Sequence, residues 1–360
     1  MARAISRCQW FGIVAIVCLN IVLWILFLTE VPALVTASKE AKHGRLGCAN
    51  GQCPFTSYGK HRPKLGHLTL TASMPEQYIP TVHNNRRLLV IGDIHGMNTE
   101  LGNLLNLAEY NPSNDHVITL GDMVNKGPDS RGVLSRLMSM NASAVRGNHE
   151  DRLLIALKEY RGRAASTHKD EVVGFRKRDK KILKAAKTLL PEQVTWLSNL
   201  PVILKAAPLN LYFVHGGLVP GVKLEKQDPW AVMNMRTLIY PQDELKRRTE
   251  TSNAELDDDD VEEAQKVIPV PIDDHSGERW TKAWNRYQKS HVKEGHRRTV
   301  MYGHDAKMGF TETRYTVGLD SGCAAGGDLT ALIVKAKGRK GFTYDKIQVP
   351  CKVARKRKGT

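Results

Sequence analysis

The stretch 88–96 reads Leu-Leu-Val-Ile-Gly-Asp-Ile-His-Gly and places two polar side chains directly after a run of apolar residues. The four apolar residues predict a short buried strand. Because side chains alternate along an extended backbone, we expect Asp93 and His95 on one side of the chain. A carboxylate and an imidazole at the end of a buried strand are half of a metal site, and the other half has to come from elsewhere in the sequence.

The same pattern recurs along the chain. Apolar runs end next to glycine and a ligand-type side chain in four further places: 116–120 before Asp122, 142–145 before Asn148 and His149, 211–214 before His215, and 299–302 before His304. Helical patterns cover 101–108, 130–140 and 152–190 between these strands. Strands that alternate with helices predict an α/β layered fold whose ligands gather at the carboxyl ends of the strands.

The chain carries a large excess of positive charge. Its 360 residues have a formal net charge of +16, and 41% of them are hydrophobic, which allows a substantial core. The charge predicts an acidic partner: a nucleic acid, an anionic membrane surface or a polyanionic substrate. The sequence contains no nucleic-acid-binding motif in which aromatic residues are interspersed with basic ones, so a nucleic acid is not required as the partner. Basic residues concentrate in 158–187 and 335–358. Each run is explained either by a solvated surface or by contact with a polyanion.

The N-terminus suggests a membrane segment. Residues 10–28 contain no charged side chain and are long enough to span a bilayer. We expect an uncleaved signal anchor, with a cleaved signal peptide as the alternative. The predicted organisation is a cytoplasmic tail at 1–9, a transmembrane anchor at 10–28, a disordered stalk at 29–85, a catalytic domain at 86–350 with an acidic insert at about 243–276, and a basic tail at 351–360.

Cysteines and one sequon bear on the compartment. Outside the apolar N-terminus, Cys48, Cys53, Cys323 and Cys351 allow three full disulfide pairings, among which the sequence does not choose. The sequon that begins at Asn141 would be usable if the body of the protein is lumenal, which is the orientation that we expect.

Taken together, the motifs resemble a known family. Gly92–Gly96, Gly121–Gly127, Gly147–Glu150, His215–Gly217 and Gly303–His304 resemble the motif series of the calcineurin-like metallophosphoesterases. They are most similar to the phosphoprotein-phosphatase branch, which includes the bacterial symmetrical diadenosine tetraphosphate hydrolases. The resemblance implies a four-layer α/β/β/α sandwich of two mixed sheets flanked by helices. The sequence segments 228–236, 302–306 and 319–323 are similar to those of the fungal vacuolar zinc-dependent endopolyphosphatases. The predicted anchor and the acidic insert are further similarities to these proteins.

The resemblance also implies a ligand set for two divalent ions, Zn, Mn, Co or Fe. Asp122 would bridge the ions, with Asp93 and His95 completing the first site and with Asn148, His215 and His304 completing the second. A hydroxide held between the ions would attack phosphorus.

Further roles are implied for the remaining polar residues of the motifs. His149 would protonate the leaving oxygen, and Asn125 would contact His149. Arg146, Arg236 and Lys126 would bind phosphate, with Arg146 also among the catalytic residues.

One position departs from the protein phosphatases. They have Asp-Arg where this chain has Asn125 and Lys126. Asn125 can accept a hydrogen bond through its amide oxygen but brings no charge, so His149 is expected to be a less readily protonated acid. A phosphate leaving group needs that proton less than an alcohol does. We therefore expect the substitution to favour phosphoanhydrides, and we expect Lys126 to lack the bidentate geometry of arginine.

These features predict a metal-dependent hydrolase that cuts inorganic polyphosphate internally. A protein Ser/Thr phosphatase or a diadenosine tetraphosphate hydrolase is the alternative enzyme, and an inactive polyanion-binding membrane protein is the alternative of another class. The expected location is the vacuole membrane, as a single-pass type II protein with a lumenal catalytic domain. Another secretory lumen or a cytoplasm-facing membrane is the alternative, and the sequence predicts no particular oligomeric state.

Overall fold

The computed structural model describes residues 68–165, 177–240, 269–338 and 341–353. They belong to one compact unit, Pro63–Thr360. The predicted cytoplasmic tail and membrane anchor, most of the stalk and of the acidic insert, and the end of the basic tail lie outside these ranges. In the described part of the chain, no helix has both the length and the apolar character needed to cross a membrane.

Across the described ranges the strands form two main sheets, here called sheets A and B, and a small third one. Sheet A has the order β1 (Thr71–Ser73), β5 (Ile203–Ala206), β6 (Leu211–Phe213), β10 (Thr299–Tyr302), β12 (Thr316–Gly318), β11 (Thr311–Thr313). Sheet B has the order β14 (Gly341–Pro350), β13 (Asp328–Lys337), β2 (Arg87–Ile91), β3 (Asp115–Thr119), β4 (Ser143–Ala144). The small sheet has the order β8 (Val270–Ile272), β7 (Thr237–Ile239), β9 (Glu278–Arg279).

Parallel pairing brings the strand ends that carry polar residues to common edges. In sheet B, β2, β3 and β4 are parallel, whereas β13 runs antiparallel to β2. Parallel neighbours need crossover connections, which are supplied by α2 (Asn98–Leu107) and α3 (Ser130–Ser139). In sheet A, β6, β10 and β12 are parallel. The segments that follow β2, β3 and β4 therefore leave sheet B at one edge, as those after β6 and β10 leave sheet A.

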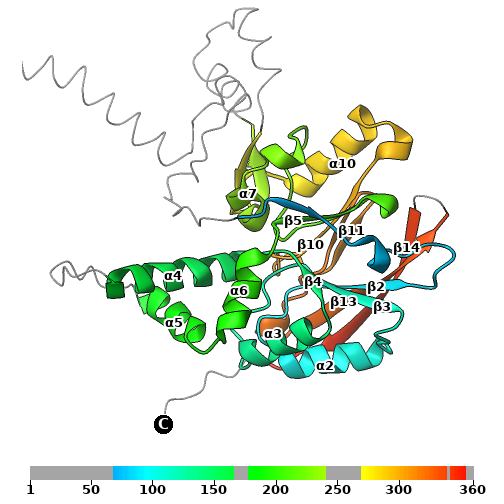
Figure 1. Cartoon of the computed structure of the whole chain (residues 1–360). Coiled ribbons are helices and arrows are strands. Elements are labelled where there is room, and N and C mark those ends of the chain that lie inside the picture. The colour runs from blue at the N-terminus through cyan, green and yellow to red at the C-terminus, as the bar shows by residue number, and fades with distance from the viewer. Residues whose placement is uncertain (1–67, 166–176, 241–268, 339–340, 354–360) are drawn as a thin grey trace, which may run out of the picture. The chain divides into compact units, whose positions relative to one another are not determined.

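Helices cover the outer faces of both sheets (Figure 1). Sheet B packs against α2, α3, α4 (Asn148–Ala165), α5 (Lys177–Ala186) and α6 (Pro191–Asn199), and sheet A packs against α7 (Pro229–Asn234) and α10 (Trp280–His291). Strand β2 shows the alternation: Leu88 and Val90 are buried between the sheets, while Leu89 and Ile91 face the helices. Fully burying such a side chain contributes about 1.5–3 kcal/mol. The predicted four-layer arrangement is confirmed.

The structure differs from the sequence prediction in three segments. The stalk prediction is wrong near its end, because β1 pairs with β5 and because Met74 and Ile79 are buried between the sheets. The predicted helix over 152–190 is instead α4 and α5, and the ammonium of Lys187 lies 3.7 Å from the centre of the Tyr160 ring. Most of the basic run 335–358 belongs to β13 and β14. The alternation of apolar and polar residues over 68–74 does indicate a strand, whereas hydrophobic periodicity did not separate α4 from α5.

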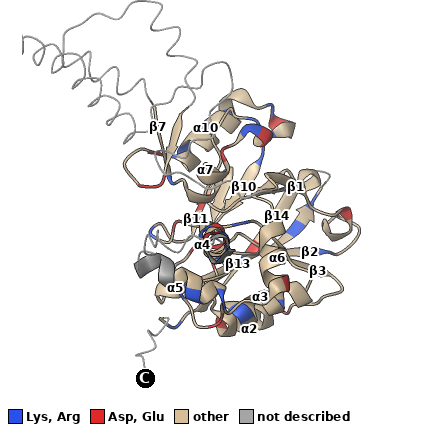
Figure 2. Ribbon diagram, turned by 60° about the vertical axis from the view of Figure 1, so that its left-hand side comes forward, with Lys and Arg blue, Asp and Glu red and all other residues tan. Residues whose placement is uncertain are grey.

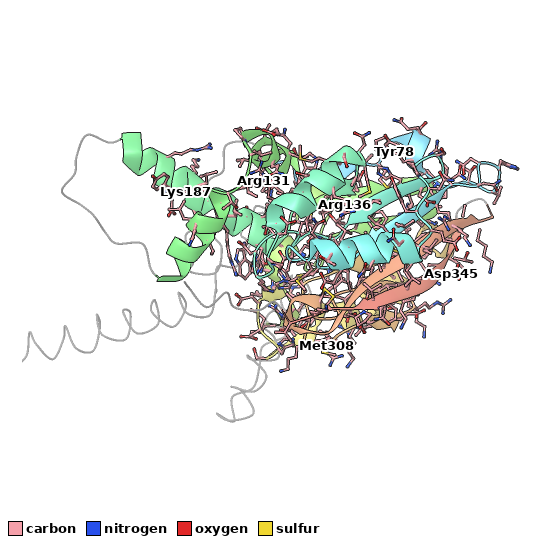
Figure 3. All side chains as sticks on the ribbon, turned by 90° about the horizontal axis from the view of Figure 1, so that it is seen from below. Tyr78, Arg131, Arg136, Lys187, Met308 and Asp345 are labelled. Atoms are coloured by element: carbon pink, nitrogen blue, oxygen red, sulfur yellow. A yellow bond between two sulfur atoms is a disulfide. The ribbon has the colours of Figure 1, made fainter. Side chains whose placement is uncertain are left out.

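Lys and Arg residues lie in both helical layers, including α3, α5 and α10 (Figure 2). Arg131 and Arg136 lie on α3 and Lys187 follows α5, on the helical side of sheet B (Figure 3). In the basic run 158–187, Lys158, Arg161, Lys184 and Lys187 are exposed. The positive charge of the described residues is therefore not confined to a single element.

One cysteine pairing is now defined. Cys323 and Cys351 form a disulfide, and both residues are buried. Cys323 lies in the turn between β12 and β13, and Cys351 directly follows β14. The bond therefore holds the end of sheet B to the turn that begins at Asp320. Cys48 and Cys53 lie outside the described residues.

Candidate metal centre

The predicted ligands gather where the two sheets meet. Their positions are set by the strands: Asp93 and His95 follow β2, Asp122 follows β3, Asn148 begins α4 after β4, His215 follows β6, and His304 follows β10. All six side chains are buried. At Gly303 a Cβ atom would overlap Oδ1 of Asp93, so only glycine lets β10 approach the end of β2 this closely.

Asp122 lies at the centre of the group. Its Oδ1 is 3.3 Å from Nε2 of His215, and its Oδ2 is 3.5 Å from Nε2 of His95. Nε2 of His95 is also 3.9 Å from Oδ2 of Asp93. Burial alone would raise the pKa of Asp122, but the neighbouring imidazoles, His215 first, hold it well below its usual range. One carboxylate oxygen thus faces each half of the site, as a bridging ligand requires.

The three histidines are oriented as neutral ligands. Nδ1 of His95 lies 3.1 Å from the Val124 carbonyl, and Nδ1 of His215 lies 2.8 Å from the Leu120 carbonyl. His304 is turned the other way, with Nε2 2.8 Å from the Asn234 carbonyl. A ring nitrogen beside a carbonyl carries the proton, which leaves a lone pair on the other nitrogen.

The pKa values of these rings follow from their surroundings. Burial lowers the pKa of His95 to about 3 and that of His304 well below its ordinary value. Burial would also lower the pKa of His215, but the charge of Asp122, whose Oδ1 lies 3.3 Å from Nε2, raises it instead.

Two buried atoms require a partner that protein atoms do not supply. Among the described residues, Nε2 of His215 and Oδ1 of Asn148 are buried without a hydrogen bond. The amide nitrogen of Asn148 donates to Oδ1 of Asn234 over 3.4 Å, which turns its oxygen toward the other ligands. An unsatisfied buried acceptor costs about 1–3 kcal/mol, and a cation removes that cost.

The ligand chemistry fits divalent metals. Within the described ranges, two groups of ligand atoms lie within 4.8 Å of one another, His95–Asp122–His149 and Asp93–Asp122–His215, and they share Asp122. Imidazole, carboxylate and amide oxygen suit Zn, Mn, Co or Fe, and no thiolate takes part. Two ions held here would activate a water molecule and offset the negative charge of a phosphoryl group.

Backbone strain is concentrated at the same place. Nine non-glycine residues of the described part have positive φ, and five of them are site residues: His95 (48°), Asp122 (52°), Asn125 (69°), Lys126 (62°) and His304 (71°). Side chains other than glycine rarely adopt this conformation, which persists where the surrounding structure enforces it and clusters at functional sites. The surrounding structure therefore holds the backbone of these loops in uncommon conformations at the residues whose side chains form the site.

Glu150 holds the loop that carries Asp122. Its Oε1 accepts hydrogen bonds from the backbone N–H groups of Met123 and Val124 (2.8 and 3.1 Å), and its Oε2 accepts from those of Asp122 and Gly147 (2.8 and 2.9 Å). The side chain is completely buried. Sequence reasoning placed Glu150 in a motif but gave it no role, because its partners are backbone groups distant along the chain.

His149 faces the ligand group from the first turn of α4. Its Nε2 lies 3.8 Å from Oδ2 of Asp122, and its Nδ1 lies 3.3 Å from the amide nitrogen of Asn125. The expected contact with Asn125 is thus present, but the amide nitrogen makes it rather than the amide oxygen. Burial lowers the pKa of His149 to about 4, against the effect of Asp122, and the charges of Lys126 and Arg152 lower it further.

Two of the expected phosphate contacts lie beside the site. Nζ of Lys126 is 2.6 Å from Nε2 of His95, so it has to move when that nitrogen binds a metal ion. The side chain of Arg236 is 24% exposed, donates to the carbonyls of Asp273 (2.9 Å) and His304 (3.2 Å), and lies 3.6 Å from Oδ1 of Asp305. Lys126 therefore lies beside His95, and Arg236 lies beside His304.

The described contacts of Arg146 are with residues other than the predicted ligands, and its role in phosphate binding stays a prediction. This residue is 1% exposed, donates to the Ser198 carbonyl over 2.6 Å and lies 3.6 Å from Oδ1 of Asp151. Its side chain extends from the end of β4 toward α6, on the helical side of sheet B, and holds these elements together.

One buried carboxylate near the site escaped prediction. Asp320 follows β12, and its charge, after burial, raises the pKa of Asp93. It lies in the turn that the disulfide of Cys323 anchors. The sequence marked this turn as a subgroup feature without a role.

Comparison with known proteins agrees with this geometry. The sequence profile of the calcineurin-like phosphoesterases matches residues 86–308. A zinc-dependent endopolyphosphatase of Saccharomyces cerevisiae is 26% identical over 315 residues, which cover 78% of this chain and 88% of the yeast protein. A symmetrical bis(5'-nucleosyl)-tetraphosphatase of Coxiella burnetii is 27% identical over 302 residues, which cover 75% of this chain and 93% of that protein.

Shorter and structural matches point the same way. The corresponding tetraphosphatase of Edwardsiella ictaluri is 35% identical over 134 residues, and this match spans only 44% of its length. A crystal structure assigned as a diadenosine tetraphosphatase superposes with a TM-score of 0.56 at 26% identity and covers 79% of this chain and 98% of its own. The chain therefore belongs to the calcineurin-like phosphoesterase family, as a dinuclear metal phosphatase.

Proposed function

We propose that this phosphatase cleaves phosphoanhydride bonds within inorganic polyphosphate, with two Zn, Mn, Co or Fe ions as cofactors. The observation that carries the proposal is the uncharged partner of His149. Its Nδ1 contacts the side-chain amide of Asn125, where a carboxylate would carry a negative charge. An amide does not stabilise a protonated imidazole as a carboxylate does. Such a site suits a leaving group that departs as an anion without a proton, as phosphate does.

Charge around the site supports a long polyanion and internal cutting. Lys126 lies on the side of His95, and Arg236 lies on the side of His304. A chain that continues beyond the scissile bond in both directions meets a cation on each side. The net charge of +16 favours such a substrate over a small neutral one.

Hydrolysis of dinucleoside polyphosphates is the second candidate. It is favoured by the tetraphosphatase of Coxiella burnetii and by the superposed crystal structure. These substrates are also phosphoanhydrides, so the same reasoning about His149 applies. Relative kcat/KM on long-chain polyphosphate, on diadenosine tetraphosphate and on a phosphoserine peptide separates the candidates. The proposal predicts this order of decreasing rate, and a preference for the peptide would overturn it.

Asn125→Asp is expected to shift selectivity toward phosphoserine. A carboxylate at this position would face Nδ1 of His149 and favour the protonated ring, which an alcohol leaving group needs. We expect the ratio of phosphopeptide to polyphosphate turnover to rise about tenfold, corresponding to one pKa unit of added stabilisation. The matched control is Asn106→Asp, an equal change at an exposed position of α2. An unchanged ratio in Asn125→Asp would contradict the proposed reason for the selectivity.

We also propose a lumenal catalytic domain on a single N-terminal anchor, in the vacuole membrane. The apolar segment 10–28 supports the anchor, and the Cys323–Cys351 disulfide supports an oxidising compartment. In sealed vesicles, the domain should resist added protease until detergent is present. Digestion of the domain without detergent would contradict this orientation.

A further inference from the structure

His275 and Asp305 form a contact beside Arg236 to which the sequence motifs give no role. Nε2 of His275 lies 3.0 Å from Oδ1 and 3.2 Å from Oδ2 of Asp305. Oδ1 of Asp305 also lies 3.6 Å from Nε of Arg236. Because the partner of His275 is a carboxylate, Nε2 carries a proton and donates it. One carboxylate therefore joins His275 to Arg236.

The guanidinium of Arg236 is held on three sides. Nη1 donates to the Asp273 carbonyl over 2.9 Å, Nη2 donates to the His304 carbonyl over 3.2 Å, and Nε faces Asp305. Among the described residues, these contacts use three of the five N–H groups of a guanidinium, and one remains on each terminal nitrogen. The side chain is 24% exposed and lies next to the backbone of a predicted metal ligand. The remaining N–H groups are therefore suited to a phosphate oxygen at the metal centre.

His275 lies in the turn between β8 and β9, which is fastened to the rest of the small sheet. Oδ1 of Asp274 accepts hydrogen bonds from the backbone N–H (2.8 Å) and from the hydroxyl (2.7 Å) of Ser276. Oγ1 of Thr237 donates to the Asp274 carbonyl over 2.8 Å and accepts from the backbone N–H of Gly277 over 3.1 Å. Thr237 begins β7 and directly follows Arg236. The turn therefore places His275 at a defined position relative to that arginine.

A carboxylate beside a phosphate-binding arginine has two opposite effects. It orients the guanidinium, and its charge repels an approaching phosphate. A second donor on the same carboxylate limits the rotation of Asp305 and offsets part of its charge. The side chains of His275 and Asp305 are 31% and 16% exposed, and such a pair contributes little to folding stability. The position of the pair beside Arg236 points instead to the orientation of the arginine.

We propose that His275 is a positioning residue for phosphate binding, which acts through Asp305 and fixes the guanidinium of Arg236 toward the metal centre. The inference rests on the proposed function, in which Arg236 meets the substrate chain on the His304 side, and it deepens that function by naming what orients the arginine. The same orientation serves any phosphate group bound at the metal centre.

Two substitutions of His275 test the contact. His275→Ala removes the donor, whereas the side-chain amide of His275→Gln supplies an N–H in its place. For His275→Ala, we expect KM on long-chain polyphosphate to rise about 5–10-fold while kcat stays within about twofold, because a binding contact is weakened and the metal ligands stay in place. His275→Gln should recover part of the loss. The control is His296→Ala in the short helix η5 (Glu294–His296), which is exposed and should match the wild type.

A double-mutant cycle with Arg236→Gln shows whether His275 acts through the arginine. We expect Arg236→Gln to raise KM about 10–100-fold, the effect of losing a charge-assisted contact. Adding His275→Ala to this variant should change KM by less than about twofold. Inhibition of p-nitrophenyl phosphate hydrolysis by orthophosphate gives a readout that needs no turnover of polyphosphate. Its inhibition constant should rise in His275→Ala by the same factor as KM.

Each outcome decides the matter. An effect of His275→Ala that persists undiminished beside Arg236→Gln would mean that His275 only supports the turn, and the proposal would be wrong. A loss in kcat alone, or wild-type values of KM and of the inhibition constant, would also overturn it. If the wild type cleaves p-nitrophenyl phosphate but not polyphosphate, the proposed function fails, and the orthophosphate readout still decides the role of His275. If polyphosphate is cleaved and His275→Ala matches the wild type, the function stands without this positioning role.

Discussion

Asp122→Asn is expected to abolish hydrolysis, with turnover falling at least about 1,000-fold. The carboxylate of Asp122 presents Oδ1 to His215 at 3.3 Å and Oδ2 to His95 at 3.5 Å. An amide offers a single neutral oxygen, and its NH₂ group would be directed at an imidazole lone pair. The variant should therefore lose the bridge between the two halves of the site, and with it at least one equivalent of metal.

Metal content and turnover of the same preparations test this prediction. The matched control is Asp129→Asn, because Asp129 caps α3 by accepting a 2.7 Å hydrogen bond from the backbone N–H of Gly132. Asparagine is an equally good cap, so this variant should keep both metal and activity. An Asp122→Asn protein that retains two metal ions and a tenth of the wild-type rate would show that Asp122 is not the bridge.

Glu150→Gln should have the largest effect on stability. In the wild type, one carboxylate accepts four backbone N–H groups from two loops and is completely buried. A glutamine amide directs its own hydrogens at two of these donors and leaves them unsatisfied. We expect the free energy of unfolding to fall by about 3–5 kcal/mol, as for other broken buried networks.

Chemical denaturation of the metal-free proteins separates this effect from metal loss. Glu192→Gln is the control, since Glu192 is exposed in the first turn of α6 and should tolerate the change. Because the loop of Asp122 is held by Glu150, the variant should also bind metal more weakly after refolding. A wild-type unfolding midpoint for Glu150→Gln would contradict the role that the structure gives this residue.

The metal ligands could be predicted because each follows the same local pattern. A buried strand such as Leu88–Ile91 is recognisable from its apolar run, and parallel strands carry their C-terminal residues to one edge. The positions of Asp93, Asp122 and His215 could therefore be predicted without knowledge of distant contacts. The resemblance of the whole motif series predicts that Asp93 and His95 share one metal site, whereas the ligand atoms group as His95–Asp122–His149 and Asp93–Asp122–His215.

Residues defined by long-range packing were not predictable in this way. The direction of Arg146 depends on where α6 packs, and nothing in the motif around Gly147 encodes that position. The contacts of Glu150 are with backbone groups, which carry no residue-specific signal. Strand β1 differs, because Leu68, Leu70, Ala72 and Met74 alternate with polar residues and indicate a strand, so that only its pairing with β5 depends on distant contacts.

The most direct test of the account is digestion of long-chain polyphosphate by the purified full-length protein with Zn or Mn present. Products are resolved by electrophoresis while most of the substrate remains. We expect intermediate chain lengths to accumulate before orthophosphate, and we expect a chelator to stop the reaction. Release of orthophosphate alone would contradict internal cutting, and an unchanged substrate in the presence of metal would contradict the proposed function.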